Sequence, residues 1–312
     1  MDLDVFFAGT AGSVPTARRG MPALLVRRGG DRLLFDCGEG AQRQLVRSIG
    51  LPEVDDVFLT HFHADHWLGL PGMLKTFDLR GRERPLAVHG PRGLREILST
   101  IRRAYGRIAY ALDLVELEPG TAVAREGYTV AAFAVEHRVP ALGYALFEDR
   151  RPGEFDPVAA ERLGIAAGPD FGRLQAGETL DGVRPEQVVG PERPGRKIVV
   201  SGDTAPASAL AVAAHEADLL VHEATFIEEE RERAAQTGHS TAAQAAALAR
   251  DADVRLLALT HLSTRYGGRE VRDEARAIFA RTEVPRDFDL VEIPFPERGE
   301  PRLVRWREPA TA

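Results

Sequence analysis

The stretch from Thr60 to His66, Thr-His-Phe-His-Ala-Asp-His, constrains this chain more than any other part of its sequence. It follows an apolar run at 57–60, so it forms the turn at the end of a strand. Such a turn can direct several imidazoles and a carboxylate at one point, which a small cation needs and a packed core avoids. A purely structural role would require each of four adjacent polar side chains to find its own hydrogen-bond partner. The stretch therefore predicts a metal site built from His61, His63, Asp65 and His66.

Three later residues are candidates for the remaining ligands of this site. His137 follows the β-rich run at 130–135, Asp203 lies in a Ser-Gly-Asp-Thr turn, and His261 follows the apolar run at 257–260. Taken singly, each is as well explained by a structural role. Because each comes just after a strand, where the loops of one sheet edge converge, we expect all three to join the first four.

Seven ligands are too many for one tetrahedral ion and suit two ions that share a carboxylate. All seven offer nitrogen or oxygen, so Zn²⁺ is the first choice, with Mn²⁺ or Fe²⁺ as alternatives. The single cysteine, Cys37, excludes an internal disulfide framework and a cysteine-rich zinc module, and fits a reducing cytoplasm. A pair of metal ions is well suited to hydrolysis of a phosphodiester.

The apolar periodicity indicates an α/β chain in two similar halves. Short runs at 4–8, 23–26, 32–35 and 57–60 predict strands in the first half, and helical spacing covers 94–105. Buried-strand runs at 197–201, 219–222 and 256–260 are separated by Ala-rich helical stretches at 207–216 and 241–252. We expect one domain over residues 1–312.

Residues 147–190 differ in texture, being rich in Pro, Gly and charged residues with one short helical stretch at 157–164. About forty residues without a strong core pattern are too many for a routine connection, so this segment is either a protruding functional element or a disordered loop. We favour the protruding element.

The formal net charge of −7 argues mildly against a nucleic-acid substrate. The distribution softens this, because arginines cluster at 18–19, 80–84, 92–107 and 150–151, whereas acidic runs such as 228–232 lie elsewhere. The N-terminus has no basic leader pattern and no 18-residue apolar stretch occurs, so we expect a cytoplasmic protein with no membrane span.

The motif His-x-His-x-Asp-His followed by a distant His, Asp and His resembles the metallo-β-lactamase superfamily. Further motifs resemble one of its families, ribonuclease Z, the tRNA 3′-processing endonuclease, in its short bacterial form. The likeness runs nearly end to end, through Gly-Thr-Ala-Gly-Ser-Val-Pro at 9–15, Leu-Phe-Asp-Cys-Gly-Glu at 34–39, Gly-Leu-Pro-Gly at 69–72, Ser-Gly-Asp-Thr at 201–204, His-Glu-Ala-Thr-Phe at 222–226, Gly-His-Ser-Thr at 238–241 and Thr-His-Leu-Ser-Thr-Arg-Tyr at 260–266.

This resemblance implies a four-layer αββα sandwich with an inserted arm, and it assigns roles to individual residues. His61, His63 and His137 would hold one zinc ion, Asp65, His66 and His261 the other, and Asp203 would bridge them. Asp65 is also the family's proton acceptor. His239, held by an acidic neighbour that we take to be Glu223, would protonate the leaving 3′ oxygen. The remaining assignments are supports behind the ligands, Asp36 and His222.

The resemblance also implies precursor tRNA as the substrate and a homodimer in which the arm of one protomer presents tRNA to the other. Residues 147–190 would be that arm, with Gly168 and Pro169 gripping the tRNA body and Arg265 also assigned to substrate binding. Cleavage would leave a 3′-OH on the tRNA and a 5′-phosphate on the trailer. The segment departs from the family pattern in being less basic than expected, since its arginines are offset by acidic residues.

Three other interpretations remain open from the sequence alone. The first is another hydrolase of the superfamily, acting on a small phosphodiester or ester, which would need no arm. The second is a di-iron oxidoreductase of this fold, which typically carries Glu at the position of His63. The third is a non-catalytic RNA-binding relative, which would have lost metal ligands that are all present in this chain. We interpret His89 and His215 as structural or surface residues.

Overall fold

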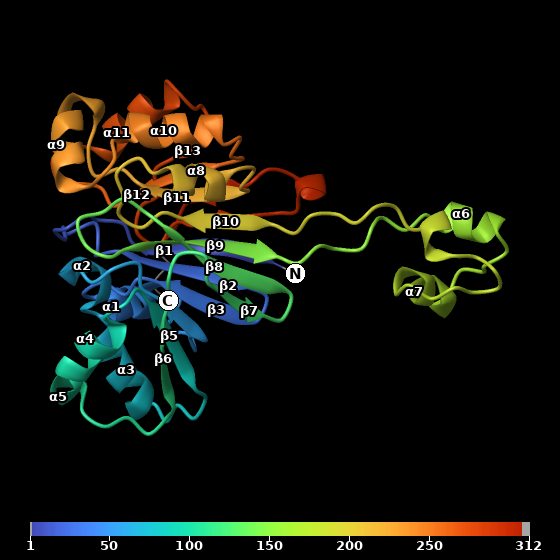
Figure 1. Cartoon of the computed structure of the whole chain (residues 1–312), viewed down its shortest axis with the longest axis horizontal. Helices are drawn as coiled ribbons and strands as arrows, with labels where there is room; N and C mark the ends of the chain where they lie inside the picture. The colour runs from blue at the N-terminus through green and yellow to red at the C-terminus, as the bar shows by residue number, and fades with distance from the viewer. Residues whose placement is uncertain (1, 308–312) are drawn as a thin grey trace.

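Two β-sheets lie face to face in the computed structural model, which describes residues 2–307 (Figure 1). The first sheet has eight strands in the order β15-β14-β1-β2-β3-β4-β5-β6. These strands are β1 (Leu3–Gly9), β2 (Ala23–Arg28), β3 (Asp31–Phe35), β4 (Asp56–Phe58), β5 (Leu86–Gly90), β6 (Leu112–Glu116), β14 (Leu290–Glu292) and β15 (Arg302–Val304).

The second sheet has seven strands in the order β13-β12-β11-β10-β9-β8-β7. They are β7 (Ala122–Arg125), β8 (Tyr128–Ala134), β9 (Leu142–Glu148), β10 (Lys197–Val200), β11 (Leu219–Glu223), β12 (Leu257–Thr260) and β13 (Thr282–Glu283). Strands β10 to β13 are parallel, and β9 is antiparallel to both β8 and β10, so β8 runs in the same direction as β10.

Helices cover the outer face of each sheet (Figure 1). The first half carries α1 (Ala41–Ser48), α2 (Ala64–Trp67), α3 (Leu70–Leu79), α4 (Leu94–Thr100) and α5 (Arg102–Tyr105). The second half carries α8 (Ser208–Ala214), α9 (Arg231–Thr237), α10 (Ala242–Asp251) and α11 (Gly268–Arg276), with short 3₁₀ turns at η2 (Glu228–Glu230) and η3 (Pro296–Arg298).

The sandwich has three apolar interfaces, which follow from the period-2 alternation of its strands. In β1, Val5 and Phe7 face the other sheet, whereas Phe6 and Ala8 face the helices of the first half. In β11, Leu220 packs on the opposite side, among the alanines of α8 and α10. The four-layer αββα sandwich predicted from the sequence is confirmed.

Two details differ from the predicted pattern. The helical stretch at 94–105 is interrupted at Ile101, whose backbone (φ −91°, ψ 4°) is not helical, so α4 and α5 are separate. The division into halves is also imperfect, because β14 and β15 cross back to the edge of the first sheet. The Ala-rich stretch at 241–252 forms α10 as expected, and Thr241 caps it by accepting a hydrogen bond from the backbone N–H of Gln244.

The arm leaves the sandwich between β9 and β10 and projects away from it (Figure 1). Its head contains α6 (Pro157–Arg162), α7 (Pro169–Gln175) and η1 (Pro185–Gln187), around a small core of its own: Ala160, Ile165, Leu174, Val183 and Val188. The stalk is paired across Arg151 and Arg193, which exchange backbone hydrogen bonds of 2.8 and 2.9 Å. The predicted insertion is therefore an ordered element with its own core.

Within the described residues, no helix is both long and apolar enough to cross a membrane.

Candidate metal centre

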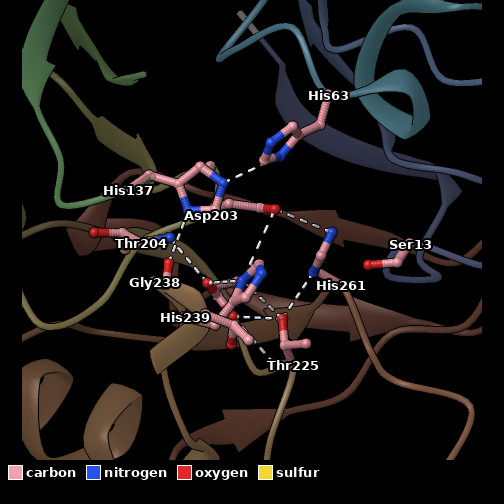
Figure 2. Close-up of polar contacts among 12 residues, drawn as sticks. Ser13, His63, His137, Asp203, Thr204, Thr225, Gly238, His239 and His261 are labelled. Atoms are coloured by element: carbon pink, nitrogen blue, oxygen red, sulfur yellow. Dashed lines mark hydrogen bonds and ion pairs between the residues drawn. The ribbon is translucent and has the colours of Figure 1, made fainter. Parts of the chain in front are cut away.

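The carboxyl ends of strands from both sheets meet at one edge of the sandwich, and the predicted ligands lie there. His61 follows β4, His137 follows β8, Asp203 follows β10 and His261 follows β12. Because β8, β10 and β12 run in the same direction, their ends deliver these side chains to the same place. Figure 2 shows His63, His137, His239 and His261 gathered around Asp203.

The first group of donor atoms comes from His61, His63, His137 and Asp203, whose ligand atoms all lie within 4.8 Å of one another. His63 Nδ1 lies 3.0 Å from His61 Nε2 and 3.2 Å from His137 Nε2. The carboxylate of Asp203 lies 3.8 Å from His61 Nε2.

The second group comprises Asp65, His66 and His261, also within 4.8 Å of one another. His66 Nε2 and His261 Nε2 are 3.3 Å apart, and Asp65 Oδ2 lies 3.5 and 3.3 Å from them. Asp203 again closes the group, with its two oxygens 3.4 Å from His66 Nε2 and 3.3 Å from His261 Nε2. Asp203 thus lies between the two groups.

Hydrogen bonds on the far side of four imidazoles fix their orientation. The Nδ1 atoms of His66 and His137 donate to Asp36 Oδ2 and to the carbonyl oxygen of Gly238, at 2.7 and 2.8 Å. Thr60 Oγ1 and Thr225 Oγ1 donate to the carboxylates of Asp36 and Glu223, and therefore accept from Nδ1 of His61 and His261, at 3.0 and 2.8 Å. With Nδ1 as the donor, the lone pair of each neutral ring is on Nε2, which faces the group of donor atoms.

The backbone at two of these positions is unusual. Asp36 and His261 both have a left-handed backbone, with φ of 57° and 56°, which is uncommon for residues other than glycine and concentrates at functional sites. Gly12 is required beside His261, because a Cβ at that position would lie 2.7 Å from His261 Nδ1. The Gly-Ser sequence at 12–13 also places the backbone N–H of Ser13 3.0 Å from Asp65 Oδ2.

The chemistry of this cluster fits a cation. Asp203 Oδ1 is buried and accepts no hydrogen bond from the residues that the structure describes, a costly state for a carboxylate oxygen. Burial disfavours the charged form of His66, yet Asp203 and Asp36 outweigh burial and raise its pKa well above the usual value. The carboxylates therefore favour a positive charge at this point, whether a proton or a metal ion.

His239 lies against Asp203 but is engaged elsewhere. Its Nδ1 donates to Glu223 Oε1 at 2.8 Å, and lies 3.9 Å from Asp203 Oδ2. Burial lowers the pKa of His239, but the charge and hydrogen bond of Glu223 outweigh it and raise the pKa to about 9. The geometry could also group His239 with Asp203 and His261 around a cation, but the bond to Glu223 leaves its Nδ1 occupied.

One face of the cluster is accessible. His61, His66, Asp203 and His261 are buried, whereas His63, Asp65 and His137 are only partly buried. A substrate would therefore approach past His63, His137 and Asp65, where His239 is also 12% exposed.

Other residues singled out from the sequence lie outside the cluster. His222 donates from Nδ1 to the carbonyl oxygen of Glu223 at 2.7 Å, and so braces the end of β11. Arg265 forms an ion pair with Glu230 at 2.7 Å. Gly168 and Pro169 begin α7 in the arm. Of the two histidines interpreted as structural or surface residues, His89 is buried against Asp56 and His215 is exposed.

Sequence reasoning missed the two threonines that support the histidines. Thr60 precedes His61, and Thr225 lies two residues after Glu223, both within the motifs already quoted. Their position in those motifs is the sequence feature that could have indicated a supporting role. It also missed the gathering of Arg18 and Arg19 with arginines from α11 and from the segment before β14.

The sequence matches the model of the metallo-beta-lactamase superfamily over residues 22–261. It is 48% identical to a ribonuclease Z of Haloferax volcanii over 305 residues, covering 95% of this chain and 96% of that protein. It is 43% identical to a ribonuclease Z of Methanosarcina acetivorans, covering 94% of this chain and 99% of that protein. The chain belongs to the ribonuclease Z family. The resemblance and the tRNA 3′-endoribonuclease activity predicted from the sequence are thereby confirmed.

One solved structure agrees with this assignment, and a second shares the fold. The short form of human tRNase Z superposes with a TM-score of 0.69 at 28% identity, over 93% of this chain and 99% of that one. A long-form RNase Z from yeast gives a TM-score of 0.63 at 17% identity, over 95% of this chain and 43% of that one, and shows the shared fold alone.

Proposed function

We propose that this chain removes the 3′ trailer from precursor tRNA by hydrolysis, leaving a 3′-OH on the tRNA and a 5′-phosphate on the trailer. The observation that carries the proposal is the pair of donor groups joined at Asp203, with His239 and Glu223 beside them. The family assignment provides the substrate class. The alternative, hydrolysis of a small phosphodiester or ester, would leave the ordered arm without a use.

The cofactor would be two zinc ions per chain, with Mn²⁺ or Fe²⁺ as alternatives. His61, His63 and His137 would hold one ion, Asp65, His66 and His261 the other, and Asp203 would bridge them. Imidazole nitrogens and carboxylate oxygens in this ratio suit zinc. When bound, such ions activate water and neutralise charge on the phosphate.

The protein's own residues would then position the substrate and move protons. The Asp65 side chain is 13% exposed beside His261, and its Oδ2 accepts from the backbone N–H of Ser13, so it would accept the proton of the attacking water. His239 is oriented by Glu223 through Nδ1, which leaves Nε2 as the atom that would protonate the leaving 3′ oxygen. An alkoxide is a poor leaving group, so this acid would contribute on the order of 10²–10⁴ in rate.

The arm would hold the tRNA body away from the cut, and the direction in which it projects favours a dimer. Strand β9 begins beside the loop that carries His137 and ends at Glu148, where the arm starts, so the arm leaves from the edge opposite the metal centre (Figure 1). An arm pointing away from its own centre is better placed to serve a second copy. Gly168 and Pro169 lie in its head and would make the contact.

The function is tested by incubating the protein with an unmodified precursor tRNA and, in parallel, with bis-p-nitrophenyl phosphate. We expect release of an intact trailer in a single cut. Hydrolysis of the small diester without any cut in the precursor would contradict the proposed substrate.

The dimer is tested by complementation between two defective chains. One chain has residues 154–189 replaced by a short Gly-Ser linker, which keeps the stalk pairing of Arg151 and Arg193, and the other carries Asp203→Ala. Each should fail alone on precursor tRNA. Mixed, they should reach about a quarter of the wild-type rate, since half of random dimers are mixed and each mixed dimer has one complete site. No recovery, with mixed dimers demonstrated, would refute presentation in trans.

A further inference from the structure

A basic hollow lies beside the metal centre, on the side of His261. Its volume is about 680 Å³, and Leu262 and Ser263, the two residues that follow His261, form part of its wall. Around it stand six arginines brought together from distant parts of the chain; we call this the arginine pocket: Arg18, Arg19, Arg269, Arg272, Arg286 and Arg305. None of the described residues that line it is acidic.

Four of these guanidinium groups have no ion pair within residues 2–307, and one of the four, Arg19, is partly buried and donates to Thr10 Oγ1 and the carbonyl oxygen of Pro285. Arg18, Arg269 and Arg286 are exposed and unpaired within that range. Two others are neutralised, because Arg272 pairs with Asp273 at 3.1 Å and Arg305 with Asp289 at 2.6 Å. A chain with a net charge of −7 therefore keeps uncompensated positive charge next to its reactive centre.

The positive groups are close enough to repel one another. Burial lowers the pKa of Arg19, and the charges of Arg286 and Arg305 lower it further, against the opposing effect of Asp287. Gathering like charges destabilises the folded state unless an anion offsets them. Guanidinium groups bind phosphate oxygens in a bidentate geometry, so phosphate is a suitable anion.

The arm cannot supply this charge. Between residues 154 and 190 its head has three arginines and seven acidic residues, and Arg173 is bound to both Asp170 and Glu178. Binding to an RNA backbone needs phosphates to be neutralised somewhere on the protein. The arginine pocket provides that charge where the strand must pass.

We propose that the arginine pocket binds backbone phosphates of the RNA strand next to the scissile bond. This inference rests on the proposed function and extends it by naming the surface that recognises the strand. Since the pocket wall begins one residue after His261, the phosphates it binds are the near neighbours of the one that is cut. Tyr266 also lines the pocket, and its buried hydroxyl has no hydrogen-bond partner in the described part of the chain.

The test compares Arg269→Gln/Arg286→Gln with a control that loses the same charge elsewhere, Arg250→Gln/Arg281→Gln. Arg250 lies in the last turn of α10 and Arg281 precedes β13, and both are paired with exposed carboxylates away from the pocket. We expect kcat/KM on precursor tRNA to fall about tenfold per pocket arginine, mainly through KM, with bis-p-nitrophenyl phosphate hydrolysis unchanged. The slope of log(kcat/KM) against log[salt] should become shallower by about 0.7 for each phosphate that is no longer neutralised.

A second variant, Arg269→Lys/Arg286→Lys, keeps the charge and should recover much of the loss. Lengthening the trailer separates the two possible sources of phosphate: a penalty that grows with trailer length places the trailer in the pocket, and one independent of length places the tRNA body there. Equal kinetics and equal salt slopes for the glutamine variant and the control would overturn the proposal.

The proposed function can fail separately, if the wild type does not cut precursor tRNA at all. In that case, the affinity for a short single-stranded RNA is measured for the glutamine variant and for the control. Weaker binding by the glutamine variant than by the control would support the arginine pocket, and equal binding would overturn it.

Discussion

Replacing Asp36 by Asn should weaken metal binding without removing any candidate ligand. Asp36 Oδ1 accepts from the backbone N–H of Thr60 at 2.8 Å, and Oδ2 accepts from His66 Nδ1 at 2.7 Å and from Thr60 Oγ1 at 2.9 Å. An amide of the same size can keep the first bond, but its NH₂ cannot accept from His66. The variant therefore loses the group that orients the His66 ring and supports its basicity.

The magnitude follows from this loss. Removing the partner behind a metal-bound imidazole typically lowers metal affinity or activity ten- to a hundredfold, which corresponds to roughly 1.4 to 2.7 kcal/mol. Breaking a buried charged pair also lowers the free energy of unfolding, by about 3–5 kcal/mol. The matched control is Asp56→Asn, because Asp56 accepts from His89 Nε2 at 2.7 Å on the adjacent strand, is as buried, and lies outside the cluster.

The assay measures Zn²⁺ affinity by competition with a chelator, hydrolysis of bis-p-nitrophenyl phosphate against free Zn²⁺, and unfolding in urea. We expect both variants to lose stability, but only Asp36→Asn to lose Zn²⁺ affinity and to regain activity at high Zn²⁺. Wild-type Zn²⁺ affinity in Asp36→Asn, or an equal loss in Asp56→Asn, would refute the role assigned to Asp36.

Three further predictions follow from the same contacts. Asp203→Ala should abolish hydrolysis of both precursor tRNA and bis-p-nitrophenyl phosphate and should lower the zinc content. Elemental analysis that found one tightly held metal per active wild-type chain would contradict the two-metal site. His239→Ala should keep its metals and its affinity for precursor tRNA yet lose most of kcat. A substrate with a sulfur-substituted 3′ leaving group should restore much of the rate. If the variant lost its metals, the role of His239 as the acid would be contradicted. Burial would raise the pKa of Glu148, but hydrogen bonds and charge from Arg196 and Arg28 outweigh it and lower the pKa. The contribution of Glu148 to stability is therefore present above its unfolded pKa near 4.5 and is lost as pH falls through the lower folded value. In urea, Glu148→Gln should have a free energy of unfolding about 3–5 kcal/mol lower than the wild type at pH 7, and this difference should shrink in acid. A difference independent of pH would refute this.

The convergence of the candidate ligands could be predicted because it depends on local rules. His61 and His261 each follow a strand, and the end of a strand is visible in the sequence as the end of an apolar run. This pattern makes both residues candidate ligands. It does not predict the left-handed backbone of His261 or the need for glycine at position 12.

What could not be predicted depends on long-range packing. The break at Ile101 lies within a stretch of continuous helical spacing, and β14 joins β1 only because the chain returns to the first sheet. The arginine pocket joins Arg18 to Arg286, and no local pattern shows that residues so far apart in the sequence share one surface.

The central claim, that this chain hydrolyses the bond between tRNA and its 3′ trailer, is tested most directly by mapping the ends of both products. A precursor tRNA labelled on each side of the junction would be digested and the terminal groups identified. The account predicts a tRNA ending in 3′-OH and a trailer beginning with 5′-phosphate, because water attacks phosphorus in line and the 3′ oxygen leaves. A 2′,3′-cyclic phosphate on the tRNA, or a trailer with a 5′-OH, would contradict it.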